Sequence, residues 1–221
     1  MIPVLTFDGP SGVGKGTVAS IVAQKLNWHQ LDSGAIYRAF AIAATDCGIE
    51  IDNLVGLLEL ASKLDLEFKS NSDHTPLSVY LDKVDVTTEL RTEKTATIAS
   101  KYAQLAPLRK VLLVKQRQFQ KTPGLVADGR DMGTVVFPDA HFKVFLTADP
   151  EERAMRRLKQ LQVGGNAGNI SHTLDGVRKR DERDKNRAHS PLKPAKDALI
   201  IDTTNLTIDE VVSKVMAIIE V

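Results

Sequence analysis

The sequence predicts an α/β fold, in which helices cover both faces of a parallel sheet and a small antiparallel sheet is inserted to one side. Three observations support this prediction. Short apolar runs alternate with segments of helical periodicity along most of the chain, and that order is typical of parallel sheets. A glycine-rich stretch joins the first apolar run to the first helical segment. Between residues 65 and 88, runs of alternating apolar and polar residues follow one another across turns, as in an antiparallel meander.

The composition is that of a globular protein, which we expect to form one domain over residues 1–221. Lys and Arg number 29 against 28 for Asp and Glu, a formal net charge of +1. No charge excess therefore points to nucleic acid or to an anionic membrane. The chain enters a strand without a signal-like segment and has no run of membrane-spanning length. We expect a cytoplasmic monomer whose partners are small molecules. Cys47 is the one cysteine, which excludes an intramolecular disulfide, and we expect it to be buried.

The strands of the main sheet and the helices between them are placed by periodicity and capping residues. Strands are expected at residues 2–7, 28–31, 125–127, 142–146 and 198–201. Helices are expected at residues 14–26, 33–48, 52–64, 89–106, 107–121, 150–162, 173–188 and 208–219. Asp32 or Ser33 can cap the second helix, and Thr207 can open the last one. Pro107 and Pro150 suit the first turns of the helices that they begin.

Two segments stand apart from this alternation. Residues 65–88 contain the predicted antiparallel insert, with strands in 66–69, 77–81 and 84–86 and a polar turn at 70–76. Residues 164–168 contain three glycines, which is typical of a mobile loop. We expect that loop to belong to a lid region over residues 156–188.

The most informative motif lies between the first strand and the first helix. It reads Gly9-Pro10-Ser11-Gly12-Val13-Gly14-Lys15-Gly16-Thr17. Glycines in this context let backbone N–H groups turn toward a polyphosphate, and the helix N-terminus adds further donors. The Lys15 charge suits the β- and γ-phosphates of a bound polyphosphate, and the Thr17 hydroxyl suits Mg²⁺. The sequence therefore predicts a phosphate-binding P-loop rather than a glycine-rich turn without a ligand.

Polar residues also follow other predicted strands. They are Asp32-Ser33, Asp128-Gly129-Arg130-Asp131 and the segment around Asp149. Because ligands of parallel sheets bind beyond the carboxyl ends of the strands, these segments are expected to meet the P-loop in one cleft. Asp128 then suits a metal-holding role, the alternative being a turn or helix cap. For the arginines, Arg38 included, the alternative is a solvated surface ion pair.

A densely charged segment, residues 178–187, lies within the helix predicted over residues 173–188. Arg180, Asp184 and Arg187 lie at i, i+4 and i+7 and would share one face of that helix. In one interpretation this is a solvated helix with an Arg180–Asp184 pair. In the other, the face closes over a polyphosphate, whose transferring group needs positive charge around its oxygens. No catalytic Ser/His/Asp set stands out, which fits a phosphate acceptor that needs no side-chain base.

Four separated motifs together resemble the bacterial cytidylate kinases, and the resemblance runs over essentially the whole chain. They are residues 8–17 (DGPSGVGKGT), 31–38 (LDSGAIYR), 127–134 (ADGRDMGT) and 179–187 (KRDERDKNR). The resemblance implies a P-loop kinase core with a mobile lid. It further implies phosphoryl transfer from ATP, with Mg²⁺, to CMP or dCMP in pyrimidine metabolism.

Carried over position by position, the resemblance implies specific roles. Lys15, Arg130, Arg180 and Arg187 would be catalytic, Thr17 and Asp128 would hold the metal, and Arg156 would join the P-loop in contacting ATP. Arg38 and Arg130 would hold the acceptor phosphate. Ser33, Ser100, Arg109 and Asp131 would surround the cytosine. Arg180 and Asp184 would meet the sugar, and Arg187 the base or the transferring phosphate.

Other functions compete with this interpretation. A kinase for another monophosphate or a small metabolite shares the P-loop, and Ser33 with Arg130 and Asp131 favours cytidylate over these. A GTP-binding switch needs an Asn/Thr-Lys-x-Asp motif after a late strand, which is absent from the sequence. A nucleic-acid-binding ATPase needs a basic path or stacking aromatics, whereas aromatic residues make up only 5% of this chain.

Overall fold

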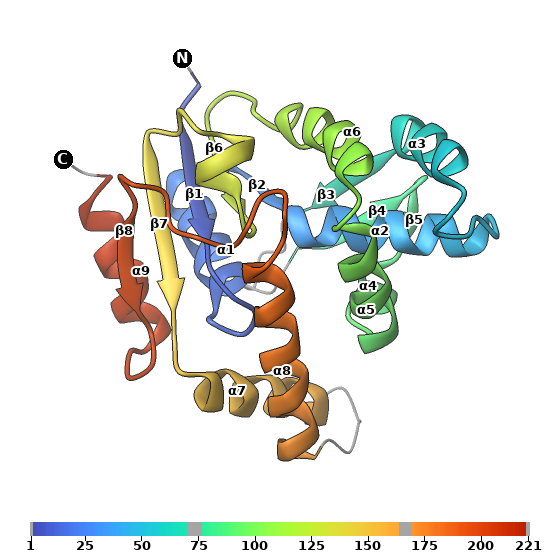
Figure 1. Ribbon diagram of the computed structural model, residues 1–221. Coiled ribbons are helices and arrows are strands. Elements are labelled where there is room, and N and C mark those ends of the chain that lie inside the picture. Colours follow the sequence, from blue (N-terminus) through green and yellow to red (C-terminus); the bar gives the residue numbers. More distant parts are fainter. Residues whose placement is uncertain (1, 70–76, 164–168, 220–221) are drawn as a thin grey trace.

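The protein is described by a computed structural model, which covers residues 2–69, 77–163 and 169–219. Five parallel strands form the main sheet in the order β2-β6-β1-β7-β8 (Figure 1). They are β1 (Val4–Asp8), β2 (His29–Asp32), β6 (Leu125–Asp128), β7 (Phe142–Thr147) and β8 (Leu199–Asp202). The predicted α/β class and all five predicted strands are thereby confirmed.

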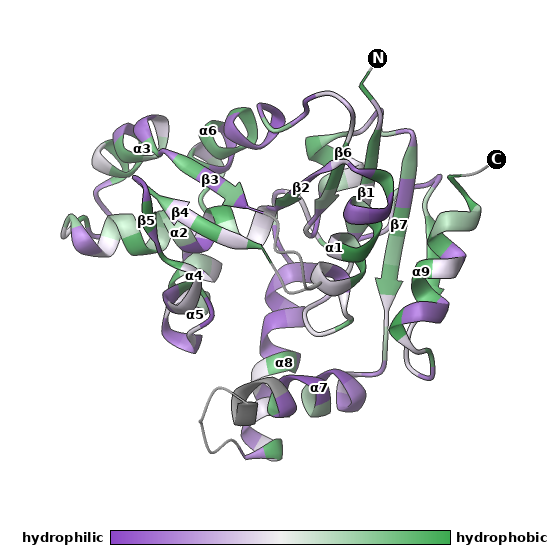
Figure 2. Ribbon diagram, turned by 180° about the vertical axis from the view of Figure 1, so that it is seen from behind, coloured by the Kyte–Doolittle hydropathy of each residue, from purple (hydrophilic) through white to green (hydrophobic). Residues whose placement is uncertain are grey.

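Both faces of the main sheet are covered because apolar side chains alternate along its strands. Leu5, Phe7 and Val126 pack on one face with α1 (Lys15–Leu26) and α9 (Ile208–Ala217). Val4 and Leu125 lie on the other face, in one hydrophobic cluster with α2 (Ser33–Asp46) and α6 (Ala106–Arg117), and α3 (Leu54–Lys63) packs against these two helices. Figure 2 shows the resulting contrast between the apolar strands β1 and β7 and the more polar outer helices.

The predicted antiparallel insert is present beside the main sheet (Figure 1). It consists of β3 (Leu66–Lys69), β4 (Ser78–Leu81) and β5 (Val84–Asp85), in that order. The pairs β3–β4 and β4–β5 are both antiparallel. Phe68 of β3 packs against Phe119, just after α6, with ring centroids 5.1 Å apart, which fixes the insert to the helical layer. The predicted turn at 70–76 lies outside the described residues.

Two charged helices extend from the carboxyl-terminal edge of the sheet (Figures 1 and 2). They are α7 (Pro150–Val163) and α8 (Ile170–Lys185), and they pack against each other. The predicted mobile loop at 164–168 lies between them and outside the described residues. None of the described helices combines the length and the apolar character that a membrane crossing requires.

The structure corrects three local predictions. The helix expected over 89–106 is divided into α4 (Thr87–Leu90) and α5 (Glu93–Tyr102), because the Thr92 hydroxyl accepts a hydrogen bond from the Thr95 N–H and starts a new helix. The helix expected over 173–188 begins at Ile170 and ends at Lys185. Cys47 is exposed rather than buried, because it caps the C-terminal end of α2, where the chain leaves the core.

One element was not predicted at all. Residues Met132–Val136 form a single π-helical turn, η1, directly after the Asp128–Asp131 segment. Turns of this kind often occur at functional sites. It places the segment that follows β6 against the end of β1.

Candidate active site

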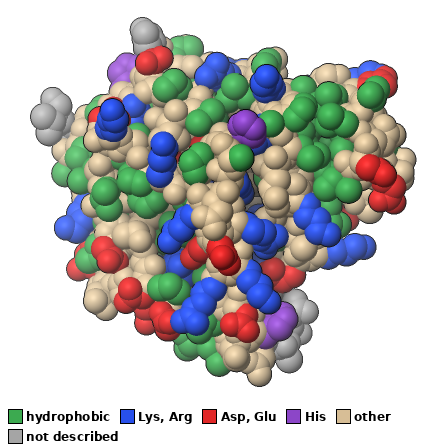
Figure 3. Space-filling view, viewed as in Figure 1, with side chains coloured by type: hydrophobic (Ala, Val, Ile, Leu, Met, Phe, Trp, Pro, Cys, Tyr) green, Lys and Arg blue, Asp and Glu red, His purple; other side chains and the backbone are tan. Residues whose placement is uncertain are grey.

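A cleft of about 1220 Å³ lies at the carboxyl ends of the parallel strands. Ten Lys and Arg side chains line it, against four Asp. The whole chain carries a net charge of only +1, so positive charge is concentrated here. Figure 3 shows Lys and Arg side chains gathered around the middle of the face over α8. Such a concentration of charge attracts and holds an anionic ligand.

The P-loop forms one wall of the cleft, and its backbone depends on glycine. Gly9 has a φ of 146°, and a Cβ there would lie 2.1 Å from the Leu146 carbonyl oxygen. Gly12 has a φ of 84° and packs against the backbone and Cβ of Arg153. These left-handed conformations let the loop wrap closely around its own centre, as phosphate binding requires.

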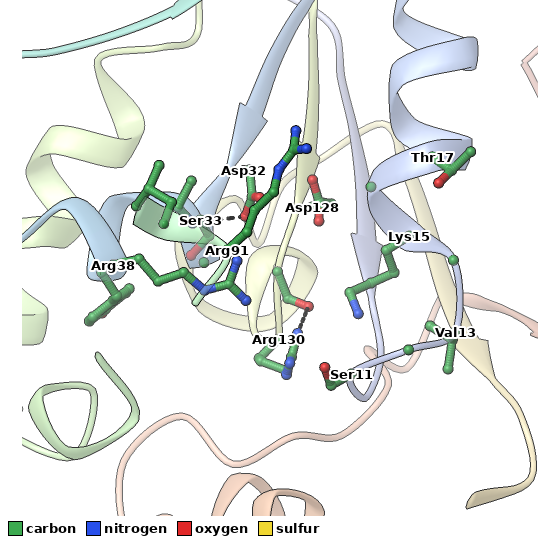
Figure 4. A pocket seen from close by; sticks show the side chains of 18 of the residues that line it. Ser11, Val13, Lys15, Thr17, Asp32, Ser33, Arg38, Arg91, Asp128 and Arg130 are labelled. Atoms are coloured by element: carbon green, nitrogen blue, oxygen red, sulfur yellow. Dashed lines mark hydrogen bonds between the residues drawn. The ribbon is translucent and has the colours of Figure 1, made fainter. Parts of the chain in front are cut away.

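Lys15 is folded into the P-loop in this structure. Its side chain donates a 2.7 Å hydrogen bond to the Pro10 carbonyl oxygen, and the residue is only 6% exposed. Burial, helped by the charge of Arg130, lowers the pKa of Lys15 to about 7. Figure 4 shows Lys15 and Arg38 on opposite sides of the cleft, with both side chains directed into the space between them.

Asp128 lies at the end of β6, opposite the P-loop (Figure 4). It is buried, and its Oδ1 has no hydrogen-bond partner among the described residues. Burial and the charge of Asp32 raise the pKa of Asp128 well above its usual range. An unpartnered carboxylate oxygen facing a second acid fits a divalent cation. No group of three potential side-chain ligands occurs in the described part of the chain, so Mg²⁺ would complete its shell with water and phosphate oxygens.

Several arginines converge on the centre of the cleft. Arg130 donates from Nε to Asp184 Oδ2 at 2.7 Å, whereas Arg38 Nε has no partner among the described residues. Burial and the charges of Arg130 and Arg38 lower the pKa of Arg180 to about 9. Like charges held this close repel one another, so an arriving phosphate would relieve the repulsion while it accepts their hydrogen bonds.

The far end of the cleft presents groups that could contact a base. Arg109 donates from Nη2 to Asp131 Oδ2 at 2.5 Å, and both side chains are largely buried. The Ser100 hydroxyl and the Tyr37 hydroxyl are buried there without hydrogen-bond partners among the described residues. Because buried polar groups are normally paired, this end is built for a polar ligand.

The predicted site residues are brought together with few exceptions. All of them from Ser11 onward line the same cleft. Gly9 and Pro10 shape the P-loop but do not line the cleft. Asp149, which was named only as part of a segment at the end of a strand, does not line the cleft either. Arg187 lies beyond the end of α8 but turns back to donate to Asp184. Asp184 pairs with Arg187 and Arg130 instead of Arg180.

Arg156 lines the cleft, but its guanidinium already donates hydrogen bonds to Thr203. It donates from Nη2 to the Thr203 carbonyl oxygen at 2.6 Å and from Nη1 to the Thr203 hydroxyl at 3.1 Å. Leu206, Ile208 and Val211 line the cleft beside it. These apolar side chains form a surface on which a flat base can pack.

Three residues at or beneath the site do not stand out in the sequence. Arg91 lies at the break between α4 and α5 and lines the cleft (Figure 4). Arg153 and Asp8 are buried beneath the cleft. A buried Arg in an otherwise charged helix leaves no distinctive local pattern, and the helix break that exposes Arg91 was itself not predicted.

Arg153 joins three elements of the site. Its Nε donates to the Ala148 carbonyl oxygen at 3.0 Å, and its Nη1 donates to the Ser11 carbonyl oxygen of the P-loop at 3.1 Å. Both Nη atoms donate to the Asp181 carboxylate of α8, at 3.1 and 2.5 Å. The P-loop and the charged helix α8 are therefore tied to one buried guanidinium.

We expect Asp181→Asn to destabilise the protein by about 3 kcal/mol, because it leaves the Arg153 charge buried without its counter-charge. The measurement is urea-induced unfolding at neutral pH. Glu151→Gln is the matched control, since it removes an exposed partner of Arg178 and should leave the unfolding midpoint unchanged. Equal midpoints for Asp181→Asn and the wild type would contradict the structural importance of this pair.

A P-loop that shares one cleft with several arginines is suited to phosphoryl transfer between two bound anions. These features place the chain in the class of P-loop phosphotransferases. Within that class, the chain belongs to the cytidylate kinase family, whose sequence pattern matches residues 5–221. It is similar to the cytidylate kinase of Aeromonas salmonicida (strain A449), with 52% identity over 220 residues that cover 100% of this chain and 95% of that protein. The cytidylate kinase of Marinomonas sp. (strain MWYL1) is 52% identical over 215 residues, covering 97% of this chain and 94% of that protein. The resemblance inferred from the four motifs is thereby confirmed.

Proposed function

We propose that this protein transfers the γ-phosphoryl group of ATP to CMP or dCMP, giving ADP and CDP or dCDP. One observation carries the proposal beyond family membership. A single cleft holds a P-loop at one end and the buried Arg109–Asp131 pair at the other, with arginines between them. A donor and an acceptor nucleotide can thus meet phosphate to phosphate.

On the donor side, the backbone of residues 9–17 would hold the phosphates of ATP. Lys15 would exchange its hydrogen bond to Pro10 for the β- and γ-phosphate oxygens. Arg156 would contact the adenosine part of ATP. Thr17 and Asp128 would hold Mg²⁺, which neutralises phosphate charge when bound.

On the acceptor side, Arg38 and Arg130 would bind the phosphate of CMP. Ser33, Ser100, Arg109 and Asp131 would surround the cytosine, while Arg180 and Asp184 would bind the sugar. Arg187 would contact the base or the transferring phosphate. The unpartnered Ser100 hydroxyl and Arg38 Nε support these roles, because each is a buried polar atom without a partner among the described residues.

The proposed reaction requires no side-chain base. The acceptor phosphate is itself the nucleophile near neutral pH, so the protein needs to align two phosphates and neutralise the transition state. Lys15, Arg130, Arg180 and Arg187 would supply the positive charge. We propose that residues 156–188 act as a lid that excludes water and thereby prevents hydrolysis of ATP.

The test is a coupled ADP-release assay with CMP, dCMP, UMP, AMP and GMP as acceptors. We expect CMP and dCMP to give the highest kcat/KM. Preferred turnover of AMP or GMP would assign the cleft to another monophosphate. Sedimentation velocity of the same preparation checks the expected monomer.

A further inference from the structure

Asp8 is a buried carboxylate for which the proposed chemistry has no use. It ends β1, immediately before the P-loop, and is only 3% exposed. Its Oδ1 accepts a hydrogen bond from the Met132 N–H and its Oδ2 accepts one from the Gly133 N–H, both at 2.8 Å. These are the first two amides of η1, the turn that follows Arg130 and Asp131.

The geometry requires a carboxylate. Two adjacent N–H groups meet two oxygens, and only an ionised acid accepts at both positions. Burial raises the pKa of Asp8 to about 6, even though the two backbone hydrogen bonds act to lower it. Burying this acid is therefore costly, and within the described part of the chain its recorded hydrogen bonds all go to η1.

The other end of η1 is also held. Arg117 of α6 donates from Nε to the Val136 carbonyl oxygen at 2.8 Å and from Nη2 to the Val135 carbonyl oxygen at 3.1 Å. Within the turn, the Asp131 carbonyl oxygen accepts from the Val135 and Val136 N–H groups at 2.9 and 3.1 Å. The start of η1 consequently sets where the Arg130 and Asp131 side chains emerge.

We propose that Asp8 is a positioning residue for the acceptor nucleotide. It ties the segment that carries Arg130 and Asp131 to the strand that ends in the P-loop, so the acceptor and donor sites keep a fixed separation. This inference rests on the proposed acceptor roles of Arg130 and Asp131. Asp8 itself touches neither nucleotide in this scheme.

Amide hydrogen exchange tests the tie directly. In Asp8→Asn, the Met132 and Gly133 amides should exchange about tenfold faster or more, because one of them loses its acceptor and the other keeps only a neutral amide oxygen. A peptide from α9 should be unchanged. Ser20→Ala is the matched control, since it removes a different buried hydrogen bond, from the Ser20 hydroxyl of α1 to Gln30 Oε1 of β2 at 3.0 Å. Unchanged exchange of residues 132–133 in Asp8→Asn would overturn the proposal.

Steady-state kinetics test the consequence. Asp8→Asn should raise the KM for CMP by about tenfold and lower kcat, with the KM for ATP changed less than about threefold. A general structural defect would move both KM values together, and that result would overturn the positioning role. If Asp8→Asn does not fold, Asp8→Glu keeps the charge one methylene further out and should show the same asymmetry.

Arg130→Gln separates this inference from the proposed function. If that variant keeps the wild-type KM for CMP, the acceptor role of Arg130 is wrong. The exchange experiment still judges the tie in that case, and faster exchange without a change in the KM for CMP would overturn the positioning role of Asp8.

Discussion

Lys15→Ala is expected to lower kcat by about 10²–10³-fold while the protein remains folded. The lysine contributes its charge to the transferring phosphate and not to a hydrophobic core. Among the described residues, the Lys15 side chain donates a hydrogen bond to the Pro10 carbonyl oxygen. Turnover in the coupled assay and the thermal unfolding midpoint are the two measurements.

Lys25→Ala is the matched control for this substitution. Lys25 lies in the last turn of the same helix, α1, and is exposed. Its removal should change neither turnover nor stability. A Lys15→Ala enzyme with wild-type turnover would contradict the P-loop role proposed for this lysine.

Asp131→Ala is expected to lower kcat/KM for CMP far more than for UMP. The exocyclic amine of cytosine can donate a hydrogen bond to a carboxylate. Uracil has a carbonyl oxygen at the same position, which the carboxylate repels. Losing a buried polar contact of this kind costs about 1–3 kcal/mol, or roughly one to two decades in rate. The structure adds a second reason, because the variant frees Arg109 from its 2.5 Å pair with Asp131 and leaves a donor for the uracil carbonyl.

The measurement is kcat/KM for both acceptors in the wild type and the variant, together with ATP affinity, which should be retained. Asp139→Ala serves as the control, since Asp139 is exposed shortly after η1. Equal proportional losses for CMP and UMP would make Asp131 a scaffold residue rather than a reader of the base.

The interior of the cleft explains why both effects should be large. Partly buried arginines repel one another there, and burial is the main cause that lowers the pKa values of Arg38, Arg180 and Arg187. Bound phosphates would supply the missing negative charge at low dielectric, where each charge has more effect than in water. Removing one charged group therefore alters the balance of closely spaced charges.

Most of the strands and helices, and the polar groups that follow the strands, could be predicted from local patterns in the sequence. Strand and helix periodicity, the P-loop glycines and the capping box of Thr207 and Glu210 are encoded within a few neighbouring residues. Such signals act through backbone preferences and local hydrogen bonds, so they can be recognised without knowledge of the fold. Most of the proposed site residues could be named for this reason, with the family resemblance adding Ser100, Arg109 and Arg156.

Which of these groups meet depends on how the elements pack in the complete fold. The strand order β2-β6-β1-β7-β8, the helix break beside Arg91 and the pairing of Asp184 with Arg130 depend on packing between distant segments. The bond from Met132 to Asp8 joins residues 124 positions apart. The free energy of such contacts comes from burial and charge in the assembled core, and no local window of sequence contains both partners.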